Sequence, residues 1–268
     1  MSEARMHETP NYAPGTFCWI ELGTSDSEAA KKFYTELFGW DTDDKPIGPS
    51  MVYTTLKQDG KDVGALYQLT AEMVSERVPP HWLSYVSVTS ADESAEKAKS
   101  LGANVMKGPF DVFTVGRMAV VKDPTGAVFA LWQAGTHKGA SVVNAPNSFC
   151  WNELGTKDTN KAGEFYTGLF GWGKKVQQMG PMNYTSFMNG DRPAGGMYEL
   201  PPEMGNIPPH WLTYFAVADT DATLEKANEI GGKTFLPAAD IPGTGRFAVI
   251  QDPQGAVFGI IRLETPPS

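Results

Sequence analysis

The stretch FCWIELGTSDSEAAKKFYTELFGW, residues 17–40, decides the fold because the chain contains it twice. It returns as FCWNELGTKDTNKAGEFYTGLFGW at residues 149–172, with 16 of 24 positions identical. Two further matched pairs follow in the same order, at residues 79–88 and 208–217 and at residues 116–129 and 245–258. An offset of about 130 residues is too long for the usual repeat arrays. The pattern therefore indicates duplication of a whole domain.

Length and composition agree with two domains. A chain of 268 residues can hold two single-core domains of ordinary size, and we expect them at residues 12–136 and 145–265. The net charge is -9, which disfavours nucleic acid and anionic lipid as partners. There is no apolar run near the roughly 20 residues needed to cross a bilayer and no secretory N-terminus. These features predict a soluble, cytoplasmic protein, with a homodimer as an open alternative.

The quoted stretch predicts a strand over residues 16–22 and a helix over residues 27–38. Ser25 and Glu28 have the form of a capping box, and Gly39 marks the helix end. One face of this helix carries a stripe at helical spacing, made of Ala30, Phe33, Tyr34, Leu37 and Phe38. We expect this stripe to pack under a sheet with Val86, Val120 and Phe129. Cys18 and Cys150 occupy equivalent places in the two copies and are predicted to be buried free thiols.

A second strand and helix follow in each half, at residues 83–88 and 92–101 and at residues 212–217 and 220–230. Short runs bounded by turn residues then predict antiparallel strands at 51–56, 64–69, 117–122 and 127–132. The sequence Asp123-Pro124-Thr125-Gly126 has the form of a type I turn, so residues 122 and 127 should face each other. The pattern is βαβββ, four times over, in an α+β architecture with helices on one face of each antiparallel sheet.

These modules resemble the vicinal oxygen chelate superfamily, which includes glyoxalase I, extradiol dioxygenases and bleomycin-binding proteins. The resemblance runs from about residue 16 to residue 263 and rests on the FY-x-x-LFGW helix end, the PPHW motif and the DP-x-G-A-V-F hairpin. It is narrower for the tandem glyoxalase-like proteins of actinobacteria. It implies two tandem glyoxalase-like domains, each of two βαβββ modules that curl into a cup. One fold hosts metal enzymes and metal-free binders, so the site must decide the function.

The resemblance also locates the positions where metal enzymes of this superfamily place His, Gln or Glu. Here these positions hold residues that do not bind metals, namely Trp19 and Trp151, Leu83 and Leu212, and Ala130 and Gly259. A catalytic divalent metal usually needs about three protein ligands. Of the four histidines, His7 and His137 fall in a predicted tail and linker. We therefore predict no metal and no cofactor.

Strand alternation sorts the remaining side chains onto two faces. It directs Phe17, Trp19 and Glu21 into the first cup, with His81, Leu83 and Tyr85 from the fifth strand. Pairing across the hairpin is predicted to place Ala119 opposite Ala130 and Arg117 opposite Trp132. The predicted ligand-binding residues of the two cups are Trp19, Glu21, His81, Tyr85, Arg117 and Trp132, and Trp151, Glu153, His210, Tyr214 and Arg246.

Each of these residues also has a structural interpretation. Glu21 and Arg117 could form an ion pair with each other, Trp19 and Trp151 could fill a closed core, and His81 and His210 could be satisfied structural histidines. The favoured function is a metal-free protein that binds a small organic molecule in an aromatic cup. The alternatives are an enzyme, through metal-free acid and base groups or an unrecognised metal site, and a purely structural role. Whether modules pair within or between halves stays open.

Overall fold

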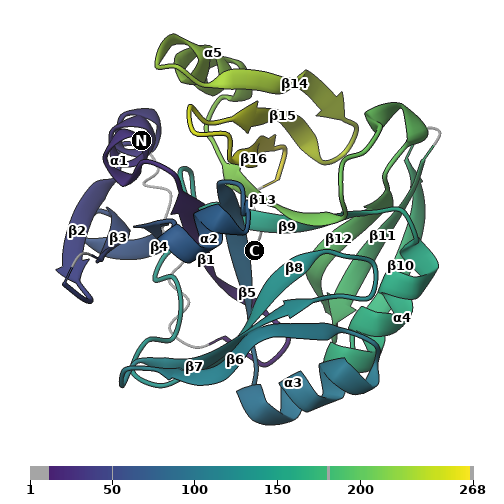
Figure 1. Cartoon of the computed structure of the whole chain (residues 1–268). Coiled ribbons are helices and arrows are strands. Elements are labelled where there is room, and N and C mark those ends of the chain that lie inside the picture. Colours follow the sequence, from purple (N-terminus) through teal and green to yellow (C-terminus); the bar gives the residue numbers. More distant parts are fainter. Residues whose placement is uncertain (1–11, 50, 180–181, 266–268) are drawn as a thin grey trace.

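Each half of the chain forms one eight-stranded sheet in the computed structural model, which describes residues 12–49, 51–179 and 182–265 (Figure 1). The first half contains β1 (Phe17–Thr24), α1 (Ser27–Phe38), β2 (Asp41–Pro46), β3 (Val52–Gln58), β4 (Lys61–Gln68), α2 (Ala71–Ser75), β5 (His81–Ser87), α3 (Ala91–Ser100), β6 (Asn104–Val112), β7 (Gly116–Lys122) and β8 (Val128–Ala134). The second half contains β9 (Phe149–Thr156), α4 (Thr159–Phe170), β10 (Gly173–Met179), β11 (Met182–Asn189), β12 (Arg192–Glu199), the 3-10 helix η1 (Pro202–Met204), β13 (His210–Ala216), α5 (Thr220–Glu229), β14 (Lys233–Ile241), β15 (Gly245–Gln251) and β16 (Val257–Leu263). This order confirms the fourfold βαβββ pattern and the α+β class. Among the described residues, no helix has the length and apolar character that crossing a membrane requires.

The two modules of each half lie side by side in the same sheet. Its strand order in the first half is β2-β3-β4-β1-β5-β8-β7-β6, and the second half repeats this order. The open question of module pairing is therefore answered, because β1 and β5 pair within one half. The expectation of purely antiparallel sheets is wrong. Strands β1 and β4 run parallel, as do β5 and β8, because each module closes its last strand beside its first.

The residue that caps the N-terminus of helix α1 lies one position later than the sequence pattern predicts. The N-cap is Asp26, whose side chain accepts a hydrogen bond from the Ala29 backbone N–H at 3.0 Å. Asp26 has the extended backbone of an N-cap, and its short carboxylate reaches the third helical amide, so the Ser25 capping box is wrong. Gly39 ends the helix in the left-handed conformation, with φ of 73°, as predicted.

The apolar stripe of α1 is buried as predicted, but it packs against the other half of the molecule. The rings of Phe33 and Tyr34 lie 6.5 and 5.5 Å from that of Phe258 on β16. The predicted partner Phe129 instead contacts Phe165 at 6.2 Å on α4. The helix-bearing faces of the two sheets therefore meet, and each half packs its first helix on the other half's last strand. Figure 1 shows that helices of the two halves also lie side by side, α1 with α5 and α3 with α4.

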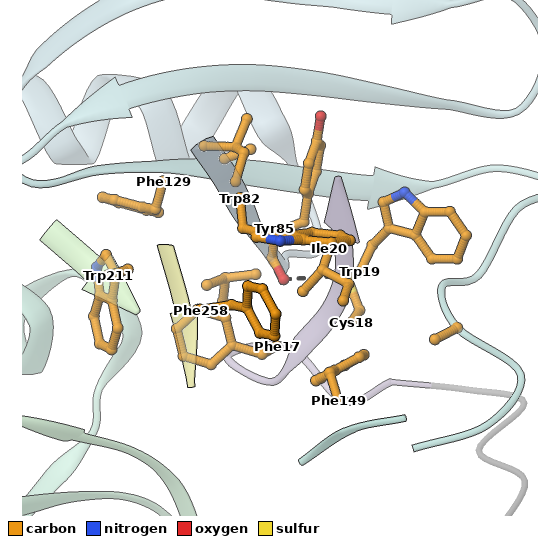
Figure 2. Packing of buried hydrophobic residues seen from close by; sticks show 14 of the residues in the cluster. Phe17, Cys18, Trp19, Ile20, Trp82, Tyr85, Phe129, Phe149, Trp211 and Phe258 are labelled. Carbon is orange, nitrogen blue, oxygen red and sulfur yellow. Dashed lines mark hydrogen bonds between the residues drawn. The ribbon is translucent and has the colours of Figure 1, made fainter. Parts of the chain in front are cut away.

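Val120, the other predicted partner of the stripe, lies on the opposite face of the first sheet. It pairs with Ala130, whereas its neighbour Val121 pairs with the buried Phe129. Figure 2 shows that Trp82 and Phe129 of the first half share one hydrophobic cluster with Trp211 and Phe258 of the second half. The interface between the halves is thus a continuous aromatic core.

Two equivalent hydrogen-bond chains cross this interface. Trp82 donates to the Tyr34 hydroxyl at 3.0 Å, which donates to Asp252 at 3.0 Å. In the second chain Trp211 donates to Tyr166 at 2.8 Å, and Tyr166 donates to Asp123 at 2.9 Å. Both aspartates belong to the DP-x-G turns. A turn in each half is therefore anchored by the first helix of the other half.

Candidate functional site

The register of the β7–β8 hairpin decides which side chains face away from the helices. Arg117 pairs with Gln133 and Met118 with Trp132, so the predicted pairing of Arg117 with Trp132 is wrong by one residue. Gly126, with φ of 116°, adds an extra residue to the turn, and the Asp123 N–H donates to the Ala127 carbonyl. A slip of one residue moves every side chain of a strand to the other face.

Arg117 and Arg246 belong to the predicted ligand-binding set, but they lie on the helix side of their sheets and not in the cups. The Arg117 guanidinium contacts both carboxylate oxygens of Asp92 on α3, at 2.7 and 2.8 Å, and Asp111 on β6 at 2.9 Å. Arg246 makes the same contacts with Asp221 and Asp240. Each arginine clamps a helix N-terminus to a strand, and the guanidinium beside Asp92 lowers the pKa of that carboxyl. The alternative of a Glu21–Arg117 ion pair is wrong for the same reason.

A bulge in β1 separates Phe17 from its neighbours. Phe17 pairs with Val86, whereas Trp19 pairs with Tyr85. The Phe17 ring lies 5.0 Å from the Trp211 ring of the second half, and Figure 2 shows it on the opposite side of β1 from Trp19. The prediction that Phe17 faces the cup is therefore wrong, since the bulge reverses the alternation at this point.

We call the face of the first sheet that turns away from the helices the first cup, defined by Trp19, Glu21, Tyr53, Tyr67, Tyr85, Trp132 and His137. Glu21 is its one carboxylate and is partly exposed. The hydroxyls of Tyr85 and Tyr53 donate to Oε2 of Glu21 at 3.0 and 3.2 Å, and Trp19 donates to the Tyr53 hydroxyl at 3.2 Å. Burial raises the pKa of Glu21 to about 7, and the two tyrosine hydrogen bonds offset part of that effect.

The second cup repeats this arrangement with Trp151, Glu153, Tyr184, Tyr198 and Tyr214. The Tyr214 hydroxyl donates to Glu153 at 3.0 Å, and Trp151 donates to the Tyr184 hydroxyl at 3.0 Å. Burial raises the pKa of Glu153, and hydrogen bonds from Tyr184 and Tyr214 oppose the rise. Both cups thus combine one desolvated carboxyl group with tyrosine hydroxyls.

Two tyrosines in each cup escape the sequence analysis, namely Tyr53 and Tyr67 and their counterparts Tyr184 and Tyr198. A signal for them exists in the repeats, because MVYTTL matches MNYTSF and GALYQL matches GGMYEL at the tyrosine. On β4, Ala65 pairs with Glu21, and Tyr67 lies two residues further on the same face. Alternation along these strands would have placed both tyrosines beside the glutamate.

Two of the predicted ligand-binding histidines lie at the start of strands that line the cups. His81 and His210 begin β5 and β13, and their Nδ1 atoms lie 2.8 Å from the carbonyls of Pro79 and Pro208. Burial lowers the pKa of both rings. A Cβ atom added to Gly155 would lie 3.2 Å from both the His210 ring and the Tyr198 hydroxyl. His210 therefore lies at one end of the second cup, on the same face as Tyr198.

His137, expected in a linker, forms part of the first cup. Its ring lies 4.4 Å from that of Trp19 in an edge-on contact, and its carbonyl accepts a hydrogen bond from Trp132 at 3.1 Å. Trp19 is only 4% exposed, whereas Trp151 is partly exposed. The linker thus covers the tryptophan of the first cup. His7 lies outside the described residues.

The side chains of the cups do not fit the metal centre that the superfamily implies. Within residues 12–49, 51–179 and 182–265 there is no group of three or more His, Cys, Asp or Glu side chains that could hold a metal ion. One carboxyl group among tyrosines is a poor donor set for a divalent metal. At Gly259, where a ligand Glu is expected, an added Cβ would collide with the Tyr214 ring. The ring of Tyr214 occupies that space.

The raised pKa of Glu21 predicts how the stability depends on pH. The folded-state pKa of about 7 lies above the ordinary value of 4.5, so the folded protein binds this proton more tightly than the unfolded chain does. The stabilisation that results is fully present below pH 4.5 and is lost as the pH rises through 7. Glu21→Gln keeps the shape without the charge. We expect the variant to be about 2 kcal/mol more stable than the parent at pH 8, with no such gain at pH 5. Urea unfolding at the two pH values measures this difference. An equal effect of the substitution at both pH values would contradict a desolvated carboxyl group.

Comparison with known proteins agrees with the fold. The family model described as Glyoxalase/Bleomycin resistance protein/Dioxygenase superfamily matches residues 16–131 and 132–260. The chain is 41% identical over 259 residues to "Putative glyoxylase CFP32" of Mycobacterium tuberculosis, covering 96% of this chain and 98% of that protein. It is 36% identical to the anthracycline biosynthesis protein DnrV of Streptomyces peucetius, covering 94% of each.

Solved structures with low sequence identity share the architecture. The Mn(II)-bound glyoxalase from Novosphingobium aromaticivorans has a TM-score of 0.64 at 15% identity, covering 95% of this chain and 86% of that chain. A variant of homoprotocatechuate 2,3-dioxygenase from B. fuscum has a TM-score of 0.65 at 13% identity, covering 97% of this chain and 75% of that chain. At these identities the likeness concerns the fold alone.

Proposed function

The chain belongs to the glyoxalase/bleomycin resistance protein/dioxygenase superfamily, and from that premise we propose that it binds a small organic molecule in its aromatic cups. The observation that carries the proposal is the partly exposed glutamate of each cup, Glu21 or Glu153, surrounded by aromatic side chains. Burying a carboxyl group among apolar surfaces destabilises a protein, and buried carboxyl groups with raised pKa values are concentrated at functional sites. An aromatic wall with one polar anchor suits a partly apolar ligand.

The hydrogen bonds of the anchor favour recognition over simple packing. In the first cup both tyrosine hydroxyls donate to Oε2 of Glu21, and Oε1 has no hydrogen bond within the described part of the chain. In the second cup Tyr214 also donates to Oε2 of Glu153. One oxygen of the Glu21 carboxyl group is thus held by tyrosines, and the other is left for a ligand.

A second candidate function is proton transfer without a metal. The pKa of Glu21, about 7, is close to the optimum for a general acid or base at neutral pH. A ligand with an acidic C–H bond beside a carbonyl group would be a suitable substrate. If Glu21 moves such a proton, a bound compound will exchange that hydrogen for deuterium in D2O, and Glu21→Gln will abolish the exchange. If a compound binds without exchanging this hydrogen, proton transfer is excluded and the binding function stands.

A thermal-shift screen of the full chain tests the binding proposal. The panel contains planar aromatic and aldehyde-bearing compounds, with tetracyclic anthraquinones added because the relative DnrV is named for anthracycline biosynthesis. A ligand at a hundredfold excess over its dissociation constant should stabilise the protein by roughly 2.7 kcal/mol. The double variant Glu21→Gln and Glu153→Gln should lose most of that stabilisation.

Arg117→Met and Arg246→Met provide the matched control. Both arginines lie on the helix side of their sheets, so these variants should bind the ligand as the parent does. The proposal fails if no compound in the panel stabilises the parent. It also fails if the arginine variants lose the stabilisation as completely as the glutamate variants.

A further inference from the structure

The second cup presents a carboxyl group within a wall of four aromatic rings. Glu153 lies on β9 with Trp151, and Tyr184, Tyr198 and Tyr214 come from β11, β12 and β13. Glu153 is in register with Gly196 on β12 and with Leu212 on β13. Glu153, Trp151, Tyr184 and Tyr198 are all partly exposed. The carboxyl group therefore lies within a partly exposed aromatic wall.

Glu153 has no cationic partner in the part of the chain that the structure describes. The arginine expected beside it, Arg246, is held by Asp221 and Asp240 on the helix side. The groups that act on the carboxyl group are tyrosine hydroxyls. A buried carboxylate is normally paired with a positive charge. Within the described residues, no positive charge offsets the desolvation of this carboxyl group.

We propose that the second cup binds an organic cation, such as a protonated amine or a quaternary ammonium group, between the Glu153 carboxylate and the rings of Trp151, Tyr184, Tyr198 and Tyr214. This inference rests on the proposed binding function and names its ligand class. The faces of tryptophan and tyrosine rings attract cations, and several rings around one site are a recurrent means of holding ammonium groups. An anionic ligand would meet no positive charge here, and a neutral one would gain a hydrogen bond from the carboxylate but no attraction between opposite charges.

Two glycines shape the wall of the second cup. A Cβ atom added to Gly196 would collide with the Tyr184 hydroxyl, and one added to Gly259 would collide with the Tyr214 ring. The first cup has Ala65 and Ala130 at these positions. The glycines let both tyrosines lie close against the sheet beside Glu153. The second cup has thus diverged from the first in the way its rings are placed.

The linker covers the tryptophan of the first cup but not that of the second. His137 covers Trp19 in the first cup, where the tryptophan is 4% exposed. Trp151 in the second cup is partly exposed. The second cup also has its own hydrophobic cluster, with Leu212, Tyr214, Val249 and Ile261 at its centre, apart from the main core.

Binding of a cation should be coupled to loss of a proton from Glu153. Burial raises the pKa of this carboxyl group, and a bound positive charge would favour the ionised form. The other titratable groups that face it are the hydroxyls of Tyr184, Tyr198 and Tyr214, with His210 at the end of the cup. Burial raises the pKa of all three tyrosines and lowers that of His210. These groups stay neutral near pH 7, so affinity for a permanent cation should rise with pH as Glu153 loses its proton.

Choline and 3,3-dimethyl-1-butanol form a matched pair of probes, because they share a shape and differ by one positive charge. We expect NMR titration of the full chain at pH 7.5 to give choline an affinity about tenfold or more above that of the neutral alcohol. Glu153→Gln should remove this preference, and Glu164→Gln, the same substitution at an exposed position of α4, should keep it. Tyr198→Leu removes the ring and should lose about five- to thirtyfold in affinity, whereas Tyr198→Phe, which retains the ring, should lose less.

The outcomes separate this inference from the binding function on which it rests. The cation inference is overturned if the neutral alcohol binds as tightly as choline, if choline does not bind, or if Glu153→Gln leaves the preference intact. In each of these cases the binding function stands when a compound of the thermal-shift panel depends on the cup glutamates. If no compound of either set binds, both fail. Equal loss from Tyr198→Phe and Tyr198→Leu would show that the ring face is not a contact, which also overturns the inference.

Discussion

Replacement of Asp123 by alanine is expected to lower the free energy of unfolding by about 3–5 kcal/mol. Asp123 is 4% exposed. Its Oδ1 accepts hydrogen bonds from the backbone N–H groups of Thr125, Gly126 and Ala127, at 2.7, 2.7 and 3.0 Å, and from the Thr125 hydroxyl. Its Oδ2 accepts from Tyr166 on the other half. Alanine removes this acceptor from the buried Ala127 N–H and from the Tyr166 hydroxyl, whereas the Gly126 N–H keeps a second acceptor in the Asp123 backbone carbonyl. Each buried unsatisfied group costs about 1–3 kcal/mol.

Urea unfolding of Asp123→Ala, Tyr166→Phe and the double variant measures this effect and its division between the turn and the interface. Tyr166→Phe removes only the link between the halves and should cost about 1–2 kcal/mol. The double variant should cost less than the sum of the two, because the two side chains share one hydrogen bond. The control is Asp26→Ala, which removes an exposed helix cap and should cost about 1 kcal/mol. A loss from Asp123→Ala no larger than that of the control would mean that the turn does not depend on this carboxylate.

The repeat and its periodicities are sufficient to predict the elements and half of the candidate site. The stripe from Ala30 to Phe38 predicts α1 and its buried face, and alternation along β1 correctly directs Trp19 and Glu21 away from the helices. These predictions succeed because they depend on local spacing alone. Tyr53 and Tyr67 carried the same kind of signal at matched places in the two halves, and alternation along β3 and β4 would have found them.

The wrong predictions concern the hairpin register and the packing partners, which depend on one extra residue or on one contact between distant parts of the chain. A single extra residue at Gly126 shifts the hairpin register and carries Arg117 to the helix side, and no periodicity records such a bulge. The stripe predicts that Phe33 is buried but not by which sheet, because Phe129 and Phe258 have the same sequence context. His137 belongs to no repeat within the described residues, so no sequence pattern predicts its contact with Trp19.

The second large expected effect arises because the first helix of each half packs on the last strand of the other half. Phe258 on β16 is fully buried and its ring contacts those of Phe33, Tyr34 and Phe38 on α1, at 6.5, 5.5 and 6.1 Å. Phe258→Ala should cost about 3–5 kcal/mol, because a cavity opens where four aromatic rings meet. Phe113→Ala is the matched control. Phe113 is 71% exposed, so its removal should change stability by no more than about 0.5 kcal/mol.

Hydrogen exchange locates where the stability is lost. Although Phe258 lies in the second half, Phe258→Ala should reduce the protection of amides in α1 of the first half more than that of amides in α4, since α4 packs on Phe129 instead. Phe129→Ala should give the reverse pattern, with α4 losing more protection than α1. Because the duplicated helices carry the same stripe, each half then acts as the control for the other. If both variants reduce protection only within the half that carries the substitution, the helices do not depend on the opposite sheet, and the aromatic interface contributes little to holding the halves together.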